Sequence, residues 1–266
     1  MKPKKKFGQH FLTSQSVISH IVEASGVQKG DFVLEIGPGQ GALTKSLVEI
    51  GANLTVIEID PDMQSVIREQ FPTVNIIDAD ASQVDFSELL DTGHSWKCLS
   101  NLPYNVGTKI VQNLLTSTVD FTNFTFMLQK EVGVRMLAQK DDRARGSLSN
   151  FVQAFGAVSK VCLVPPGAFF PPPNVDSIVI HIVPHEIPIF HPCRLETFEE
   201  LNRALFAQPR KAIRNSLKKC FSKEVVEELA LLSLVDFALR PAQVGLDQVV
   251  DLVTALEKIH AKGYND

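Results

Sequence analysis

The sequence has no long apolar run and no closely paired cysteines. None of its hydrophobic stretches approaches the about 20 residues that a membrane-spanning helix needs, and no apolar segment follows the N-terminal lysines, so we expect neither a membrane anchor nor a signal peptide. The four cysteines include no C-x-x-C pair, which argues against disulfides and against a zinc site. His191 and Cys193 are close in sequence, but a short turn explains them. We therefore expect a cytoplasmic protein without a metal.

Internal repeats are also missing, and the overall charge is not basic. No repeat with a period of about 20–50 residues is present, which excludes a solenoid. The apolar fraction of 44% and the charged fraction of 21% are typical of globular proteins, and 266 residues suffice for one large domain and one small one. The net charge of −4 does not by itself suggest a nucleic-acid partner, but the basic residues are unevenly distributed.

The main cluster of basic residues lies in the segment 201–220, which contains six basic residues and no acidic one. Their spacing predicts a helix with basic residues on one face and anchoring apolar residues on the other, namely Arg210, Arg214 and Lys218 against Ile213, Leu217 and Cys220. A solvated helix face is the ordinary explanation of such a run, and contact with RNA phosphates is the alternative. The N-terminal lysines and the pair Arg143 and Arg145 form smaller basic clusters.

A glycine-rich turn follows the first predicted strand. The apolar run Phe32–Ile36 is followed by Gly-Pro-Gly-Gln-Gly at residues 37–41, and residues 42–49 are predicted to form a helix. Such a turn lets a ligand approach the backbone and the free N–H groups of the helix. Glu35 and Pro38 depart from the dinucleotide pattern G-x-G-x-x-G. A carboxylate at this position disfavours a pyrophosphate and favours a cationic or zwitterionic ligand.

Acidic or amide side chains follow three further predicted strands. Glu58 follows the strand at 53–57, Asp80 comes soon after the strand at 74–77, and Asn101 follows the strand at 96–100. Because open parallel sheets bind ligands at the carboxyl ends of their strands, we expect these side chains and Gly37 to surround one ligand. Asp60, which precedes Pro61, is explained as a helix N-cap.

The tetrapeptide Asn101-Leu102-Pro103-Tyr104 has the chemistry needed to hold a planar exocyclic amine. The Asn101 amide oxygen and a backbone carbonyl can each accept a hydrogen bond from an NH2 group. Pro103 fixes the backbone between them, and Tyr104 offers a ring face for stacking. A strand followed by an ordinary prolyl turn is the structural alternative.

Together, these motifs resemble class I S-adenosylmethionine-dependent methyltransferases that act on adenine N6. Four further segments are similar to the small-subunit ribosomal RNA adenine dimethyltransferases, the KsgA family, and these lie at residues 7–12, 127–132, 165–177 and 210–217. The resemblance extends from Phe7 to about Leu217. Two positions depart from the family pattern, because His10 stands where Asn is more common and Pro209 interrupts a basic pair.

The resemblance implies a Rossmann-like, mostly parallel sheet with an antiparallel edge, followed by a small all-helical domain. The edge would come from the strand-like runs 158–164 and 177–183, which flank a loop rich in proline. Residues 185–192 are polar and punctuated by proline, and helical periodicity follows them. We therefore predict a catalytic domain at 1–191 and a helical RNA-binding or ribosome-binding domain at 192–266.

The resemblance also implies S-adenosylmethionine as the cofactor and assigns residues to it. Glu58 would hold the ribose hydroxyls, Asp80 the adenine amino group and Glu35 the ammonium. Gly37 and Gly39 would let the methionine part lie against backbone. The N-terminal segment would close over the cofactor through His10 and Leu12, and Asn101 would border it.

For catalysis, the resemblance implies that Asn101 and the Leu102 carbonyl accept both N–H bonds of the target amine, on a turn fixed by Pro103. Tyr104 would stack on one face of the adenine and Phe169 on the other. The proton can leave after transfer, so no strong base is required, which fits the absence of a suitably placed histidine or lysine at this strand end.

The implied substrate is a pair of adjacent adenines in the hairpin near the 3′ end of 16S rRNA, in the small (30S) subunit during ribosome biogenesis. We expect a monomer whose RNA contacts are Arg203, Arg210, Lys211, Arg214 and Lys218. A large-subunit rRNA adenine N6-methyltransferase of the antibiotic-resistance type and an assembly checkpoint factor acting mainly by binding remain alternatives. Leu102 disfavours a DNA adenine methyltransferase, and Glu35 with Pro38 disfavours a dehydrogenase.

Overall fold

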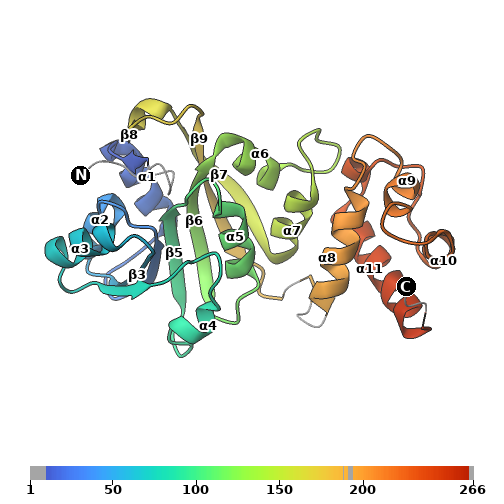
Figure 1. The fold of residues 1–266 in the computed structure, drawn as a ribbon, viewed down its shortest axis with the longest axis horizontal. Helices are drawn as coiled ribbons and strands as arrows, with labels where there is room; N and C mark the ends of the chain where they lie inside the picture. Colours follow the sequence, from blue (N-terminus) through green and yellow to red (C-terminus); the bar gives the residue numbers. More distant parts are fainter. Residues whose placement is uncertain (1–9, 188, 191–193, 264–266) are drawn as a thin grey trace. The chain divides into compact units, whose positions relative to one another are not determined.

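A computed structural model describes residues 10–187, 189–190 and 194–263 (Figure 1). The start of the 7–12 motif and the predicted turn at His191 and Cys193 lie outside these residues. The chain forms two compact units, one made of Met1–Gly133 and Ala157–Pro184 and the other of Val134–Gly156 and His185–Asp266. The functional division at residue 192 stays a prediction, because compactness does not test which segment binds RNA. Within the described ranges, no helix is long and apolar enough to span a membrane.

The first unit is built on a seven-stranded sheet with the order β4-β3-β2-β5-β6-β9-β7 (Figure 1). Strands β4, β3, β2, β5 and β6 pair in parallel, whereas β9 pairs antiparallel with β6, which confirms the predicted antiparallel edge. The strands are β2 (Phe32–Ile36), β3 (Asn53–Glu58), β4 (Asn75–Asp78), β5 (Trp96–Asn101), β6 (Phe121–Gln129), β7 (Gly156–Val164) and β9 (Ser177–Pro184).

The helices between these strands follow directly from local sequence signals. Residues Val17, Ile18 and Ile21 form the buried stripe of α1, in keeping with helical spacing. At the start of α3 the Asp60 side chain accepts a hydrogen bond from the backbone N–H of Asp62 at 3.1 Å, with Pro61 next to it, as the sequence predicts. The helices are α1 (Gln15–Ser25), α2 (Ala42–Ile50), α3 (Pro61–Gln70), α4 (Phe86–Leu89) and α5 (Gly107–Leu115).

A two-stranded sheet that the sequence did not predict joins the N-terminal segment to the proline-rich loop. Strand β1 (Phe11–Leu12) pairs antiparallel with β8 (Phe169–Phe170), which follows a short 3-10 turn at Pro166–Ala168. The Thr13 hydroxyl also donates to the Ala168 carbonyl at 3.1 Å. The segment 10–13 is therefore held in place by residues that follow it by more than 150 positions.

The second compact unit is mainly helical and has its own aromatic core. The rings of Phe190 and Phe198 stack at 4.2 Å, and Phe151 and Phe155 pack around Phe198. The Asn202 amide donates to the Ser147 carbonyl at 2.9 Å and links α8 to α7. The helices are α6 (Lys130–Leu137), which the boundary cuts, α7 (Ser147–Phe155), α8 (Leu195–Leu205), α9 (Ile213–Leu217), α10 (Lys223–Leu232) and α11 (Leu246–Ala261), with a 3-10 turn at Pro241–Gln243.

The prediction that Arg210, Arg214 and Lys218 share one helix face is wrong. Between α8 and α9 the chain is not helical, so Arg210 lies in a turn, and Lys218 is the C-cap that follows α9. Pro209 has no N–H and disfavours a helical conformation of the preceding Gln208. The Ser216 hydroxyl instead bonds both backbone groups of Gln208, at 3.1 and 3.0 Å.

The apolar side of the predicted helix is partly correct. Ile213 and Leu217 are buried and anchor α9, as their spacing indicates. Cys220 is exposed and does not anchor the segment.

Candidate active site

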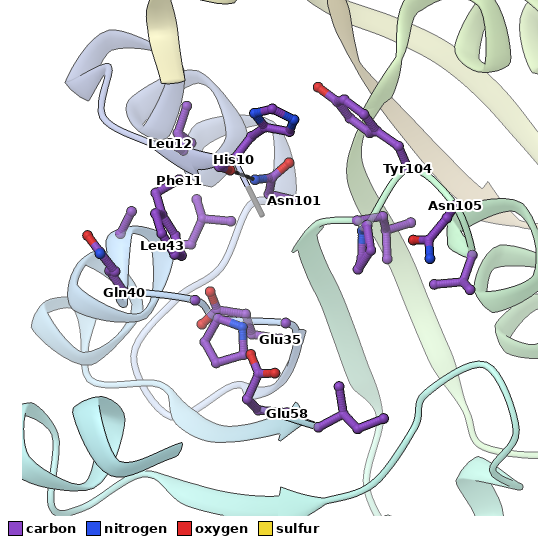
Figure 2. Close-up of a pocket in the computed structure, with 18 of the residues that line it drawn as sticks. His10, Phe11, Leu12, Glu35, Gln40, Leu43, Glu58, Asn101, Tyr104 and Asn105 are labelled. Carbon is purple, nitrogen blue, oxygen red and sulfur yellow. Dashed lines mark hydrogen bonds between the residues drawn. The ribbon is translucent and has the colours of Figure 1, made fainter. Parts of the chain in front are cut away.

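A cavity of about 270 Å³ opens at the carboxyl ends of β2, β3 and β5 (Figure 2). It lies wholly within the first compact unit. The structure brings together there all but one of the predicted catalytic and cofactor residues, namely His10, Leu12, Glu35, Gly37, Gly39, Glu58, Asp80, Asn101, Leu102, Pro103 and Tyr104. Five segments distant in sequence therefore converge on one cavity, and four of them follow strands of the sheet, as expected for an open parallel sheet.

The orientation of the Asn101 amide is fixed by the N-terminal segment. Its Nδ2 donates a hydrogen bond to the backbone carbonyl of His10 at 3.2 Å (Figure 2). The carbonyl can only accept, so the NH2 side of the amide faces His10. In the part of the chain that the structure describes, Asn101 Oδ1 has no hydrogen-bond partner and remains available to a donor in the cavity.

The turn after Asn101 presents a second acceptor. The Leu102 N–H donates to the Met127 carbonyl at 3.1 Å, which fixes this residue against β6. The Pro103 carbonyl caps the next helix by accepting from Val106 and Gly107 at 3.3 and 2.8 Å. Among the described residues no donor is bonded to the Leu102 carbonyl. Asn101 and Leu102 thus offer the two acceptors that an exocyclic amine requires.

Tyr104 is held at both ends of its side chain. Its hydroxyl lies 2.6 Å from the Ser177 hydroxyl at the start of β9, and its ring lies beside the His10 ring with centroids 5.9 Å apart. Burial raises the pKa of the Tyr104 phenol, and the hydrogen bond with Ser177 partly opposes this shift. The ring is therefore neutral and preorganised for stacking.

His10 lines the cavity, where the sequence placed it beside the cofactor, and its backbone carbonyl also contacts Asn101. His10 Nδ1 lies 2.8 Å from the Pro171 carbonyl, which can only accept, so Nδ1 carries the proton. In the neutral ring Nε2 is then an acceptor. The sequence gives no signal for the contact between His10 and Asn101, because the β1–β8 pairing that holds His10 there is only two residues long.

Glu35 lies buried at the base of the cavity (Figure 2). Its Oε2 accepts a hydrogen bond from the Thr44 hydroxyl of α2 at 2.7 Å. Burial raises the pKa of the Glu35 carboxyl to about 7, and the nearby Glu58 adds to the shift. Within the described residues it forms no ion pair, so a cationic ligand would supply a charge that the protein does not.

Glu58 ends β3 and is also largely buried. Its Oε1 accepts from the backbone N–H of Asp60 at 2.8 Å. Burial raises the pKa of this carboxyl, while hydrogen bonds from the Asp60, Gly39 and Ile59 backbone oppose the rise. An ionised carboxylate has about four acceptor positions, so a position beyond these three backbone donors remains for a ribose hydroxyl.

Asp80 is partly engaged by its own turn. Its Oδ1 accepts from the hydroxyl and backbone N–H of Ser82 at 2.7 and 2.9 Å, and Oδ2 accepts from Gln83 at 2.9 Å. The Ser82 hydrogen bonds lower the pKa of Asp80. An ionised carboxylate has about four acceptor positions, so one position on Oδ2 stays free for an amino group.

The glycine turn adopts backbone conformations that other residues rarely accept. Gly37 and Gly39 have φ values of 64° and 56°. A Cβ atom on Gly39 would come within 3.1 Å of the Phe11 ring, which lines the same cavity. This turn therefore brings bare backbone against the ligand space.

Phe169 does not line the cavity. Its side chain is 4% exposed and packs in the core with Leu12 and Ala168, whereas the adjacent Phe170 is 65% exposed. The alternation follows from the strand β8, where successive side chains point to opposite sides. In this position the buried ring offers no open face to the cavity, and the stacking of Phe169 on a base stays a prediction.

The five predicted RNA-binding residues all lie in the second compact unit. Lys211 and Lys218 line one shallow basic cavity, and Arg210 lines another. Arg203 is exposed on α8, and the Arg214 guanidinium stacks over the Phe237 ring at 5.4 Å. The structure therefore divides three of the five residues between two cavities and leaves Arg203 and Arg214 outside both.

A family model described as ribosomal RNA adenine dimethylase matches residues 1–256. The chain belongs to this family. It is 38% identical to the ribosomal RNA small subunit methyltransferase A of Pseudomonas fluorescens, over 98% of this chain and 96% of that protein. The fold matches a dimethyladenosine transferase from Plasmodium falciparum with a TM-score of 0.75 at 23% identity, covering 94% and 98% of the two chains. It also matches the 23S rRNA methyltransferase ErmE with a TM-score of 0.67 at 23% identity, covering 93% and 99%.

Membership of the rRNA adenine dimethylase family makes the chain a methyltransferase that uses S-adenosylmethionine. The cavity suits this cofactor because its two buried carboxylates, Glu35 and Glu58, have no cationic partner in the described chain. Glu35, Glu58 and Asp80 would hold its ammonium, ribose and adenine groups. When bound, the cofactor supplies an electrophilic methyl group.

The amine acceptors give this dimethylase site its chemistry. The lone pair of an adenine N6 amine is delocalised into the ring, which makes the nitrogen planar and weakly nucleophilic. Two acceptors on its N–H bonds favour a pyramidal nitrogen with a directed lone pair. In such a reaction the protein would contribute positioning and electrostatics, and Asn101 and the Leu102 carbonyl have the geometry to supply both.

Proposed function

We propose that this protein dimethylates N6 of two adjacent adenines in the hairpin near the 3′ end of 16S rRNA, within the small ribosomal subunit. The observation that carries the proposal is the Asn101 amide, whose NH2 is bound to the His10 carbonyl so that its oxygen remains for an incoming amine. The relative from Pseudomonas fluorescens, named for the small subunit, supports the choice of substrate.

The roles of the site residues follow from their positions in the cavity. Asn101 and the Leu102 carbonyl hold the amine, Pro103 fixes the turn between them, and Tyr104 stacks on the base. The adenine must be unpaired or flipped out of its helix to reach this site. Gly37, Gly39, His10 and Leu12 surround the cofactor, together with the carboxylates described above.

The wider biological setting is part of the same proposal. We infer that the protein acts as a monomer in the cytoplasm, on a partly assembled 30S subunit during ribosome biogenesis. Its second compact unit would contact rRNA phosphates through Arg203, Arg210, Lys211, Arg214 and Lys218. The exposed position of most of these side chains supports that role.

Methylation of large-subunit rRNA is the nearest alternative. The match to ErmE supports it only through the fold, because the identity is 23%. A checkpoint factor that acts by binding alone is a second alternative. The intact arrangement of Asn101 and Tyr104 favours an active enzyme.

The test is transfer of a labelled methyl group from S-adenosylmethionine to under-methylated small subunits, compared with large subunits, naked rRNA and duplex DNA. Primer extension then locates the modified base. We expect stops at two adjacent adenines near the 3′ end of 16S rRNA. Labelling of large-subunit RNA alone would contradict the proposed substrate, and binding to subunits without labelling would support the checkpoint role.

A further inference from the structure

The second compact unit contains an arginine-lined cavity, separate from the cofactor cavity, with a volume of about 770 Å³. It is many times larger than the roughly 30 Å³ that one water molecule occupies in the liquid, so it can admit a group of several heavy atoms. Four arginines and two aspartates line it, together with three uncharged residues. The charged residues are Asp141, Asp142, Arg143, Arg145, Arg210 and Arg240.

Arg145 is the most unusual of these residues because its charge is buried. The residue is 6% exposed, and its Nε has no hydrogen-bond partner. Its Nη1 makes two long hydrogen bonds to neutral acceptors, the Ala138 carbonyl at 3.4 Å and Gln153 at 3.3 Å. No carboxylate of the described chain lies within ion-pair distance of the guanidinium.

This arrangement is energetically unfavourable without an anion. A buried charge that lacks a paired countercharge loses hydration and gains little in return. Burial accordingly lowers the pKa of Arg145, and Asp141 opposes the shift only partly. The guanidinium still carries its proton, since arginine is not deprotonated in proteins. An anion entering the cavity would supply the missing countercharge.

The two aspartates do not fill that role. Both are exposed, and the Asp142 carboxylate accepts a hydrogen bond from the Ala144 backbone at 3.0 Å within its own loop. Asp141 has a positive φ of 69°, and its N–H donates to the Ala242 carbonyl at 2.9 Å. That bond ties the loop at 141–145 to the turn at Pro241–Gln243, so two segments far apart in sequence form one preorganised wall.

We propose that this cavity binds a phosphate group of the RNA backbone. Guanidinium groups match phosphate oxygens in paired, planar hydrogen bonds, and several arginines together suit a group with more than two acceptor oxygens. Arg210 continues directly into Lys211, which lines the second basic cavity, so an RNA strand would meet both sites in succession. The choice of RNA as the source of the phosphate rests on the proposed function.

The first experiment uses the full-length protein and inorganic phosphate. Thermal unfolding is followed in phosphate and in chloride at equal ionic strength. We expect phosphate to raise the midpoint for the wild type and for Lys258→Gln, which removes one exposed positive charge on α11 outside the cavity. We expect Arg145→Gln to lose this response and to be at least as stable as the wild type in chloride, because it removes an uncompensated buried charge.

A purely structural role for Arg145 predicts the opposite pattern. Arg145→Gln would then be destabilised equally in both salts, and phosphate would still raise its midpoint, which would overturn the proposal. Arg143→Gln covers the case in which Arg145→Gln does not fold, because Arg143 is exposed. Its response to phosphate should be smaller than that of the wild type, and an unchanged response would also overturn the proposal.

The second experiment identifies the source of the phosphate. Binding to under-methylated small subunits is measured without cofactor at several salt concentrations. We expect Arg145→Gln to reduce the slope of log affinity against log salt by about one, as for one lost phosphate contact, and Lys258→Gln to leave it unchanged. A phosphate response with no change in this slope would assign the site to free phosphate and overturn the RNA assignment.

The two proposals fail in distinguishable ways, because these readouts need no methyl transfer. Wild-type protein that labels only large-subunit RNA would contradict the proposed substrate while leaving the phosphate response of Arg145 in place. Correct methylation of 16S rRNA with no phosphate response in the wild type would contradict the cavity alone.

Discussion

The Nδ2 atom of Asn101 and the backbone carbonyl of His10 are joined by a hydrogen bond of 3.2 Å across 91 positions of the chain. An asparagine amide is nearly symmetric in shape, so its chemistry depends on which end faces the substrate. The hydrogen bond fixes the orientation of the Asn101 amide, and its acceptor is a main-chain atom of His10. The orientation therefore does not depend on the identity of residue 10, which explains how His can stand where the family more often has Asn.

Replacing Asn101 with alanine should strongly reduce methyl transfer while leaving cofactor affinity nearly unchanged. The substitution removes one of two acceptors for the amine, and the loss of one such preorganised group lowers kcat by about 10²–10³-fold in other enzymes. Single-turnover assays and calorimetry with S-adenosylmethionine measure the two effects. Asn75→Ala, an exposed amide at the start of β4, is the matched control and should behave as the wild type. Retained turnover in Asn101→Ala would exclude the amine-holding role.

Replacing Glu58 with alanine should weaken S-adenosylmethionine binding by about 10–100-fold, because hydrogen bonds to a charged group contribute about 1.5–3 kcal/mol. Calorimetry measures the change. Glu49→Ala is the control, since Glu49 is exposed and only pairs with Lys45 at 3.9 Å. An affinity equal to that of the wild type would contradict the contact with ribose.

The unliganded protein should lose stability as pH rises from about 4.5 to about 7 through the titration of Glu35. Burial raises the pKa of Glu35 in the folded state from 4.5 to about 7, so in this window the folded protein binds more protons than the unfolded chain. The stabilisation from Glu35 is fully present below the unfolded pKa of 4.5 and is lost as the pH rises through the folded pKa of about 7. The full stabilisation is on the order of 3 kcal/mol, because each unit of pKa shift corresponds to about 1.4 kcal/mol.

Urea unfolding at several pH values tests this expectation. Glu35→Gln cannot ionise and should show a flatter profile between pH 5 and 7 than the wild type. The side chains that interact with Glu35 are Thr44, Glu58 and Cys98, and burial raises the pKa of Cys98 well above this range. Parallel profiles for the two proteins would show that Glu35 is already ionised in the folded state.

Phe169 and Phe170 should differ sharply when each is replaced by alanine. Phe169→Ala removes a buried core ring and should lower the free energy of unfolding by about 3–5 kcal/mol. Phe170→Ala changes an exposed side chain and should alter it by no more than about 0.5 kcal/mol. Denaturant unfolding compares the two, and a small loss of stability in Phe169→Ala would contradict the packing of its ring in the core.

Much of the fold was predictable because its signals are local. The run Phe32–Ile36, the glycines after it and the Asp60-Pro61 cap each specify structure within a few residues. The convergence of Glu35, Glu58, Asp80 and Asn101 then follows from one rule about parallel strands. These features needed no knowledge of distant contacts.

The errors concern contacts that local patterns do not determine. Spacing alone placed Arg210 on a helix with Arg214, but the Ser216 hydroxyl and Pro209 favour a turn at Gln208. The two-residue strands β1 and β8 are too short for a periodic signal, so the approach of His10 to Asn101 was missed. Nothing in the sequence showed that Arg145, but not Arg143, would be buried.

The pairing of β1 with β8 has a consequence for when the enzyme becomes active. His10 and its partner Pro171 are 161 positions apart, and at synthesis rates of about 5–20 residues per second the ribosome needs roughly 8–30 s to make the chain between them. Until then a nascent chain already possesses the glycine turn, the carboxylates and Asn101 but cannot fix the arm that orients the amide. The proposed amine-holding arrangement is therefore completed late in translation, after nearly all of the sheet has been made.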